Sequence, residues 1–371
     1  MNDVQTLGRP QPKSWIAALS PYVPGKASNA DGRPVVKLSA NENPLGTGDA
    51  ARAAFAEGSV DLASYPDPAA TGLREAIAAR HGLDPERVIC GTGSDELLHV
   101  VAGCYAGPGD EIVYVRYGFA VYDIAARRVG AVPIIAPDHD YGTDVDALLA
   151  CVTDSTRLVF VANPNNPTGT MSSREEIARL HAGLPSHVVL VLDQAYAEYL
   201  EPEDEDGGLA LAREASNVLV TRTFSKIHGL AAERVGWAYG ASGIIENMHR
   251  IRGPFNVTTA GQAAAVAAMA DEQWVARSRD HNRQWRQWFS DEVAAMGNLG
   301  LSIVPSKANF VLTLFKGRLT AQAAFEGLMQ AGYATRWLPG QDLPDGLRIT
   351  VGSEAHMRDV ARLLRDMAER A

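Results

Sequence analysis

Between residues 72 and 255, short apolar runs rich in Val, Ile and Leu alternate with longer stretches of helical periodicity. Strand-length runs separated by roughly 10–15-residue helices are typical of βαβ units. The runs are continuously apolar, which favours a sheet covered by helices on both faces. We therefore predict an α/β domain built on a large, mostly parallel sheet. Its strands are expected at 88–90, 112–115, 132–135, 158–161, 188–192, 218–220 and 235–238.

The chain divides into three predicted parts. Residues 1–40 form an N-terminal arm, which we expect to pack with the smaller domain, and residues 41–260 form the large domain. Residues 261–371 begin with a long helical stretch over 262–296 and then alternate strands and helices. This pattern predicts a smaller α+β domain. The acidic segment 201–206 is interpreted as a solvated loop.

Composition excludes several classes of protein. The 371 residues carry 34 Lys and Arg against 44 Asp and Glu, a formal charge of −10, which argues against a general nucleic-acid binder. No apolar run reaches the roughly 20 residues that span a bilayer, and the first residues lack the apolar core of a secretory signal. The three cysteines show no CxxC spacing, so neither a disulfide framework nor a zinc site is expected. These features predict a cytoplasmic enzyme with no metal, membrane or nucleic-acid partner.

Polar side chains follow five of the predicted strands at the point where each strand ends. In an open parallel sheet, ligands bind in the crevice beyond the carboxyl ends of the strands. We therefore expect these side chains to surround one polar, phosphorylated ligand. The segments are Gly91–Glu96, Arg116–Gly118, Asn163–Gly169, Asp193–Tyr196 and Thr221–Lys226.

Each of these features also has a purely structural explanation. The glycines beside Thr92 open a helix, where they form either a tight turn or an anion site at the helix N-terminus. They are not a dinucleotide-binding fingerprint, because Glu96 stands at the third glycine position, which disfavours a nicotinamide dehydrogenase. Asp193 at the end of an apolar strand is either a structural ion-pair partner or a functional carboxylate. Lys226 is either a surface lysine or an amine whose pKa is lowered by desolvation, as Schiff-base chemistry requires.

Taken together, these residue types suit pyridoxal 5′-phosphate. This cofactor needs a lysine for its aldehyde, a carboxylate beside its ring nitrogen and donors at its phenolic oxygen. It also needs an aromatic side chain against its ring and a cradle for its phosphate. The chain offers one candidate for each requirement.

Several motifs resemble those of the fold type I aminotransferases. These are Asn163–Gly169, Asp193 with Tyr196, and Ser225-Lys226 with Arg234. More narrowly, the chain resembles the histidinol-phosphate aminotransferases over nearly its whole length, in the motifs Leu38–Gly46, Tyr65–Pro68 and Gly93–Glu96. The resemblance implies a three-layer, mostly parallel-sheet pyridoxal-phosphate transferase domain with a smaller α+β domain.

The resemblance also implies roles for residues around the cofactor. Lys226 forms the Schiff base, Asp193 keeps the ring nitrogen protonated, and Asn166 and Tyr196 hydrogen-bond the phenolic oxygen. Tyr117 stacks on the ring. The phosphate is held by Ser94, Asp95, Glu96, Thr223, Ser225 and Arg234, and by Tyr65 of the neighbouring subunit, so a homodimer with shared active sites is expected.

For the substrate, the resemblance implies that Arg348, with Arg336 as a second candidate, binds the acidic group. Tyr22 and Asn41 would close the site. The implied reaction is ping-pong transamination of histidinol phosphate with 2-oxoglutarate or glutamate, in histidine biosynthesis. Lys226, Asp193 and Tyr196 are the predicted catalytic residues, and Lys226 is expected to move the substrate proton.

Two positions depart from the pattern of the family. Relatives commonly carry Glu at Gln194 and an aromatic residue at His228. We expect a minor effect from Gln194, and we interpret His228 as a spacer that lines the cleft or tunes substrate choice.

The same motifs leave room for different functions. An aromatic-amino-acid aminotransferase of broad specificity is the main alternative, because its substrates also present a ring on a short arm. The sequence is also compatible with a decarboxylase of phosphorylated amino acids on the same scaffold, and with a cofactor-sensing regulator that has no catalytic activity.

Overall fold

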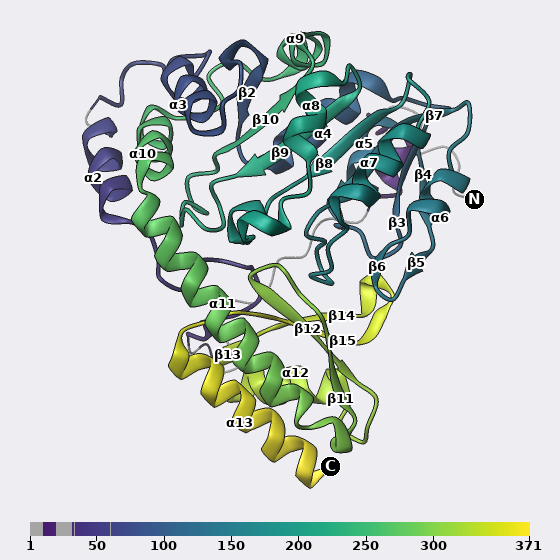
Figure 1. Cartoon of the computed structure of the whole chain (residues 1–371), viewed down its shortest axis with the longest axis vertical. Helices are drawn as coiled ribbons and strands as arrows, with labels where there is room; N and C mark the ends of the chain where they lie inside the picture. Colours follow the sequence, from purple (N-terminus) through teal and green to yellow (C-terminus); the bar gives the residue numbers. More distant parts are fainter. Residues whose placement is uncertain (1–9, 20–31, 33, 60) are drawn as a thin grey trace.

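The computed structural model describes residues 10–19, 32, 34–59 and 61–371. The chain forms a large domain and a smaller one, and the long helix α11 (Glu272–Ala294) extends from the large domain into the small one (Figure 1). Three short 3-10 helices accompany the large domain at Pro85–Arg87, Ala197–Tyr199 and Pro202–Asp204, and two the small domain at Gly297–Leu299 and Pro339–Gln341.

The large domain is built on a seven-stranded sheet in the order β2-β10-β9-β8-β7-β3-β4. Of these strands, β10 alone runs antiparallel to its neighbours, so the predicted mostly parallel sheet is confirmed. The strands are β2 (Val88–Gly91), β3 (Glu111–Val115), β4 (Val132–Ala136), β7 (Thr156–Ala162), β8 (Val189–Asp193), β9 (Val218–Thr223) and β10 (Gly236–Gly240). A small hairpin of β5 (Asp138–His139) and β6 (Gly142–Thr143) lies beside it.

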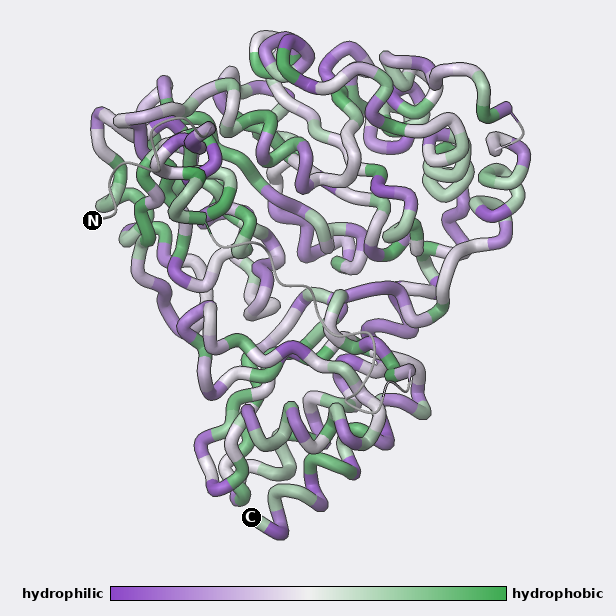
Figure 2. The backbone as a smooth tube through the Cα atoms, turned by 180° about the vertical axis from the view of Figure 1, so that it is seen from behind, coloured by the Kyte–Doolittle hydropathy of each residue, from purple (hydrophilic) through white to green (hydrophobic). Residues whose placement is uncertain are grey.

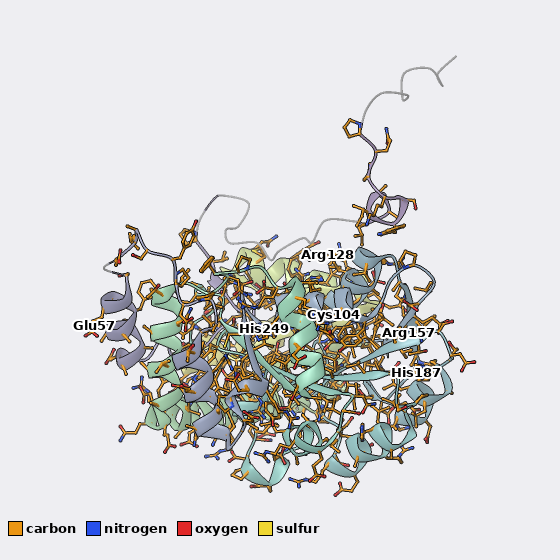
Figure 3. The ribbon with its side chains drawn as sticks, turned by 90° about the horizontal axis from the view of Figure 1, so that it is seen from above. Glu57, Cys104, Arg128, Arg157, His187 and His249 are labelled. Carbon is orange, nitrogen blue, oxygen red and sulfur yellow. The ribbon has the colours of Figure 1, made fainter. Side chains whose placement is uncertain are left out.

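Helices cover both faces of this sheet, as the continuously apolar strands predict. One face packs against α4 (Ser94–Tyr105), α5 (Val121–Val129) and α9 (Ser242–Ile251). These helices carry Cys104, Arg128 and His249, which are labelled in the view from above in Figure 3. The other face packs against α2 (Asp49–Gly58), α3 (Thr71–His81), α6 (Val145–Ala150), α7 (Arg174–Gly183), α8 (Gly208–Glu214) and α10 (Thr259–Ala270). The strands therefore lie in the middle of three layers, and many of their residues are hydrophobic, green in Figure 2.

The small domain has a four-stranded antiparallel sheet in the order β11-β12-β15-β14. Its helices are α11, α12 (Ala321–Gln330) and α13 (Glu354–Arg370), and they enclose an apolar core of their own. This arrangement confirms the predicted α+β domain. The strands are β11 (Leu301–Val304), β12 (Phe310–Phe315), β14 (Arg336–Leu338) and β15 (Leu343–Thr350).

The described part of the N-terminal arm contacts both domains. At its end, β1 (Val36–Lys37) pairs with β13 (Tyr333–Ala334) and Leu38 joins the small-domain core. The short helix α1 (Ser14–Ala17) instead lies against α5 of the large domain, where the Trp15 ring packs on Gly130. A bulky side chain at residue 130 would clash with this ring, so the contact depends on the glycine.

The predicted boundary at residue 260 falls too early. Helix α10 packs against the large-domain sheet through Ala264, Ala265, Ala268 and Met269. The single helix predicted over 262–296 is in fact two helices, because the chain leaves helical geometry at Asp271 (ψ 74°). The Asp271 side chain then accepts a hydrogen bond from the Trp274 amide at 2.9 Å and starts α11. The packing therefore places the domain boundary near Asp271.

The acidic segment 201–206 is not simply a solvated loop. Glu201 and Asp204 pair with Arg283 on α11 and with Lys307, both at 2.7 Å, so the segment ties the large domain to the small-domain side. Asp206 is buried and accepts hydrogen bonds from other side chains. From a run of acidic residues in the sequence, it cannot be predicted that these carboxylates have partners elsewhere in the chain.

All three cysteines are free. Within the described residues, no helix is both long enough and apolar enough to cross a membrane.

The small-domain core offers a test of this packing. Phe289 on α11 is fully buried among apolar side chains of the small domain. Phe289→Ala should lower the free energy of unfolding by about 3–5 kcal/mol in urea denaturation, through lost apolar contact and the cavity left behind. Gln287→Ala, at an exposed position of the same helix, is the control. A loss equal to that of the control would show that this core is wrongly described.

Candidate active site

A cavity of about 290 Å³ lies at the carboxyl ends of the large-domain strands. Four of the five strands singled out in the sequence end in residues that line it, and the fifth contributes Phe119, which follows its turn. The small domain and the segment before Asn41 supply the opposite side, with Lys37, Ser39, Arg336 and Arg348. From the large domain come Ser94, Asp95, Phe119, Asn166, Asp193, Tyr196, Thr223, Ser225, Lys226 and Arg234.

Lys226 lies just beyond the end of β9 with its amine inside the cavity. Its Nζ donates a hydrogen bond to the Ala40 carbonyl at 3.0 Å. Burial, together with the nearby Arg348 guanidinium, lowers the pKa of the Lys226 amine to about 8, whereas Glu42 opposes the shift. The prediction of a desolvated amine is confirmed. A large fraction of this amine is therefore neutral near pH 8 and can act as a nucleophile or a base.

Asp193 is the last residue of β8, and its carboxylate is buried. Oδ2 accepts a hydrogen bond from the Tyr122 hydroxyl at 3.1 Å, and Oδ1 accepts one from the Thr221 hydroxyl at 3.2 Å. Burial raises the pKa of Asp193 to about 6, although these two hydrogen bonds pull it down. No cation forms an ion pair with Asp193 in the part of the chain that the structure describes. The structural salt bridge considered from the sequence is therefore absent there, and the carboxylate is available to a ligand.

The side chain of Tyr122 is held in place by an aromatic contact of its ring. It stacks on Phe160 with the centroids 4.8 Å apart and the planes within 7°. Its contact with Asp193 depends on helix α5 and strand β8 being brought together by the sheet. Sequence analysis missed Tyr122, because nothing in the sequence links it to a carboxylate 71 positions away.

Asn41, Tyr196 and Arg348 join the two domains at the cavity. The Asn41 side-chain amide donates to the Tyr196 hydroxyl at 2.8 Å. Arg348 donates from Nη1 to Asn166 Oδ1 at 2.6 Å and from Nη2 to the Ser39 carbonyl at 2.5 Å. Burial raises the pKa of Tyr196 to about 12, so its hydroxyl stays protonated and can donate a hydrogen bond.

The other end of the cavity has the features of a phosphate cradle. Helix α4 begins at Ser94, after Gly93 in the left-handed region (φ +84°). A Cβ on Gly93 would lie only 2.5 Å from Arg234 Nη2, so glycine lets the guanidinium approach the helix start. Arg234 Nη1 also donates to the Ser225 hydroxyl at 3.0 Å. Backbone amides at a helix N-terminus together with a guanidinium favour an anion.

Two residues predicted at the cofactor, Tyr117 and Glu96, are not among those that line the cavity. Tyr117 is buried and stacks on Tyr141, with centroids 5.6 Å apart, and Phe119, two residues further on, lines the cavity. The Glu96 carboxylate accepts hydrogen bonds from the Thr92 amide and from Asn256, which stabilises the turn before α4.

Tyr65 also lies outside the cavity of its own chain. It is 81% exposed and stacks on Phe255 at 4.6 Å. Tyr22 lies outside the described residues. Among the predicted substrate residues, Asn41, Arg336 and Arg348 do line the cavity.

Gln194 and His228 line a second cavity of about 250 Å³, separate from the one that holds Lys226. The interpretation of His228 as a spacer in the cleft is therefore wrong. Gln194 has a specific role, because its Oε1 accepts from Arg222 at 2.8 Å and its Nε2 donates to Asp206 Oδ1 at 2.5 Å. A glutamate could not donate to Asp206 and would set two carboxylates against each other. Glutamine at this position therefore supplies the hydrogen-bond donor that the buried Asp206 carboxylate needs.

The residues of the main cavity fit pyridoxal phosphate. One cavity is lined by a desolvated amine, by a buried carboxylate with no cationic partner among the described residues, and by a cradle with Arg234. Lys226 would hold the aldehyde carbon, Asp193 would face the ring nitrogen, and Ser94, Asp95, Ser225 and Arg234 would hold the phosphate. No group of His, Cys, Asp and Glu suited to a metal ion occurs among the described residues.

Comparisons with known proteins agree with this fit. The sequence profile of the family "Aminotransferase class I and II" matches residues 33–364. The histidinol-phosphate aminotransferase of Sphingopyxis alaskensis is 63% identical over 95% of this chain and 96% of its own length. That of Zymomonas mobilis is 59% identical, covering 97% of this chain and 98% of its own length.

A solved structure is similar as well. The histidinol-phosphate aminotransferase of Sinorhizobium meliloti, crystallised in complex with pyridoxal-5′-phosphate, superposes with a TM-score of 0.87 at 28% identity, over 96% of this chain and 97% of its own. Fold, site and relatives define a fold type I aminotransferase. The chain belongs to the class I and II aminotransferase family and, within it, to the histidinol-phosphate aminotransferases.

Because the Asp193 carboxylate is buried, we expect that removing its charge stabilises the fold, and that the gain depends on pH. The pKa of Asp193 is about 6 in the fold against an ordinary value of 3.8, so the free energy of unfolding falls as pH rises from about 4 to above 6. Without cofactor, Asp193→Asn should therefore be more stable than the wild type at pH 8, by about 1–3 kcal/mol, and the gain should be smaller at pH 5. Urea denaturation at both pH values measures the gain.

The control for this experiment is Asp49→Asn, which changes a fully exposed carboxyl on α2. A gain for Asp193→Asn that does not grow with pH would contradict the described burial of the carboxylate.

Proposed function

We propose that the chain catalyses the pyridoxal-phosphate-dependent transamination of histidinol phosphate, with 2-oxoglutarate as the amino acceptor, by a ping-pong mechanism. The observation that carries this proposal is the joint burial of the Lys226 amine and the Asp193 carboxyl in one cavity between the domains. The choice of substrate is supported by the names of the relatives that are 59–63% identical.

When bound, the cofactor supplies an electron sink for the carbon that carries the amino group. The protein has to place this carbon and move its proton. The Lys226 amine, with a pKa of about 8, is able to accept that proton and to return it at the cofactor's aldehyde carbon. Its contact with the Ala40 carbonyl fixes the amine at the boundary between the domains.

Asp193 would hold a proton on the ring nitrogen by its negative charge. A cation beside a buried carboxylate lowers the pKa of that carboxyl, so the ring nitrogen and Asp193 would stabilise each other's charged form. Tyr122 and Thr221 orient both carboxylate oxygens. Tyr196 and Asn166 would orient the phenolic oxygen, and an aromatic side chain of the segment after β3, Tyr117 or Phe119, would pack against the ring.

The acidic groups of the two substrates would share one binding region. Arg348 and Arg336 lie on neighbouring small-domain strands, where Arg336 is paired with Arg348 in the β14–β15 register. Guanidinium groups bind carboxylates and phosphates with similar geometry. One region can therefore bind the phosphate of histidinol phosphate in one half-reaction and a carboxylate of 2-oxoglutarate in the other.

The lysine provides the first functional test. Lys226→Ala should reduce the rate of steady-state transamination by at least about 10³-fold, because the general base and the attachment point are both lost. Lys226→Arg keeps the charge but has no readily neutral amine, so it should be similarly inactive. Appreciable turnover by the alanine variant, measured by 2-oxoglutarate consumption, would contradict the role of Lys226.

Substrate choice is tested with a panel of competing substrates. We expect kcat/KM with 2-oxoglutarate to be higher for histidinol phosphate than for phenylalanine or tyrosine, because only the first carries a phosphate for the cationic region. Faster turnover of the aromatic amino acids would favour the broad-specificity aminotransferase. Release of carbon dioxide from threonine phosphate would favour the decarboxylase.

We further propose that the active unit is a homodimer whose sites are shared. Leu62, Tyr65, Ile251 and Phe255 are exposed apolar side chains of the large domain, 87%, 81%, 51% and 39% accessible. Tyr65 and Phe255 stack on each other, and exposed apolar contacts of this kind are typical of a surface that is covered by a partner. In a dimer, Tyr65 would reach the cofactor phosphate of the other subunit, which accounts for its absence from the cavity of its own chain.

Subunit mixing tests this sharing. Tyr65→Ala and Lys226→Ala should each be impaired alone, whereas mixed dimers should regain activity, because one of their two sites carries both intact residues. With equal amounts and random exchange, about half of the dimers are mixed, and each mixed dimer has one intact site, so activity should approach a quarter of the wild-type value. No recovery after verified exchange would contradict a shared site.

A further inference from the structure

Asn41 is buried between the domains, and each of its polar groups takes part in a hydrogen bond. Its backbone lies in the left-handed region (φ +57°), which asparagine tolerates better than most residues. The backbone amide donates to the Thr350 hydroxyl at 3.0 Å, and the carbonyl accepts from the Asn309 side chain at 3.0 Å. Oδ1 accepts from the same Thr350 hydroxyl at 3.0 Å, and Nδ2 donates to the Tyr196 hydroxyl at 2.8 Å. Asn41 therefore links strand β15, which ends at Thr350, to Tyr196 of the large domain.

The Thr350 hydroxyl determines which way the Asn41 side-chain amide faces. A hydroxyl has one proton to donate and two lone pairs that accept. Because Thr350 Oγ1 accepts from the Asn41 backbone amide, its own proton is free to be donated, and Asn41 Oδ1 is the acceptor. If the amide were turned by half a rotation, Nδ2 would face Oγ1, and the Thr350 proton would lose this acceptor at a position that is only 2% exposed. Since an unpaired buried donor costs stability, Oδ1 faces Thr350 and Nδ2 faces Tyr196.

This orientation determines the direction of the hydrogen bond at Tyr196. Nδ2 can only donate, so the Tyr196 hydroxyl oxygen accepts and keeps its own proton for another acceptor. Within the part of the chain that the structure describes, the Tyr196 hydroxyl donates to no acceptor. Tyr196 lines the main cavity, and its pKa of about 12 keeps the proton on the oxygen. The proton is therefore available to a ligand in the cavity.

We propose that Thr350 is a positioning residue that acts through Asn41 to direct the Tyr196 proton at the phenolic oxygen of the bound cofactor. The inference rests on the proposed function, which assigns Tyr196 to that oxygen. It adds a residue that does not itself line the cavity. The donors follow one another in a single direction, from the Asn41 backbone amide through Thr350 and the Asn41 side chain to Tyr196. A strand of the small domain thereby sets a hydrogen bond that the large domain makes.

The absorbance of the bound cofactor reports on this hydrogen bond. A donor stabilises the negatively charged form of the phenolic oxygen, so it lowers the pH at which the visible absorbance of the cofactor changes. Thr350→Val removes the hydroxyl and retains the branched shape. It should raise this midpoint by about 0.5–1 on the pH scale, as expected when one hydrogen bond to a charged oxygen is weakened.

A double-mutant cycle distinguishes positioning from a general structural effect. Tyr196→Phe removes the donor itself and should raise the midpoint at least as much as Thr350→Val. In the Tyr196→Phe background, Thr350→Val should give no further shift, because its effect passes through Tyr196. Thr350→Ser keeps the hydroxyl and should restore the midpoint of the wild type. Thr350→Cys has only a weak donor of similar size, so it should shift the midpoint in the same direction and replaces Thr350→Val if that variant does not fold.

Thr313 provides a matched control on the neighbouring strand β12. It is fully buried, and its hydroxyl has no hydrogen-bond partner among the described residues. Thr313→Val makes the same chemical change in the same sheet without removing a hydrogen bond. It should leave the midpoint unchanged.

Cofactor binding to the apoprotein provides a second readout that needs no turnover. The Kd of pyridoxal phosphate should rise about three- to tenfold in Thr350→Val and stay unchanged in Thr313→Val. An unchanged midpoint in Thr350→Val, or a shift of the same size in the Tyr196→Phe background, would overturn the inference. Neither titration uses a substrate. If the wild type does not turn over histidinol phosphate, the proposed function fails, and the two titrations still decide whether Thr350 directs the Tyr196 proton.

Discussion

The site depends on two groups that the fold buries although each would be better solvated in water. Burial pushes the pKa of the Lys226 amine down and that of the Asp193 carboxyl up, so both are moved towards their neutral forms. Neither shift is cancelled by a direct ion pair among the described residues. A cationic ring between the two groups would restore the charge on Asp193 and leave the lysine able to release its proton. The cavity is thus prepared for a ligand that supplies the missing charge.

The large domain makes this arrangement rigid. Asp193 lies opposite Thr221 in the register of two central parallel strands, and its second oxygen is held by Tyr122, whose ring is stacked on Phe160. The unsatisfied charge is therefore fixed by elements on both sides of β8. Functional groups on rigid strands are positioned more accurately than groups on mobile loops. The substrate region, by contrast, is shared between domains and depends on how they meet.

Contacts between the domains combine two apolar clusters, one that includes Tyr117 and one that includes Tyr196, with several polar pairs. Arg348 reaches from β15 to Asn166, and the acidic segment pairs with Arg283 and Lys307. Arg116 pairs with Asp342 at 2.5 Å across the same boundary. Each of these exposed ion pairs contributes little to stability.

The sequence predicts the parts of the site that follow from local order along the chain. Lys226, Asp193 and Asn166 each come at or shortly after the end of an apolar run, and a parallel sheet has to gather such positions at one edge. The sequence does not predict that Phe119 lines the cavity. It also misses partners that depend on packing between distant segments.

Asp206 and Tyr122 are the clearest examples of such partners. In the sequence, Asp206 is one of a run of acidic residues typical of a solvated loop, yet it is buried against Asn163 and Gln194. Tyr122 has the pattern of an ordinary core aromatic on α5, yet its hydroxyl holds the Asp193 carboxylate. The domain boundary at residue 260 fails for the same reason, because the Ala-rich α10 has no local signal that tells which core it covers.

The most direct test of the account is the first half-reaction, followed by the visible absorption of the bound cofactor. Protein reconstituted with pyridoxal phosphate should lose its long-wavelength band when histidinol phosphate is added without an acceptor. The band should return on addition of 2-oxoglutarate, with one equivalent of amino group transferred per site, and Lys226→Ala should complete neither change at a comparable rate. A wild-type band that is insensitive to histidinol phosphate but responds to another amine would contradict the proposed substrate. A band that responds equally well in Lys226→Ala would contradict the central role of the buried lysine.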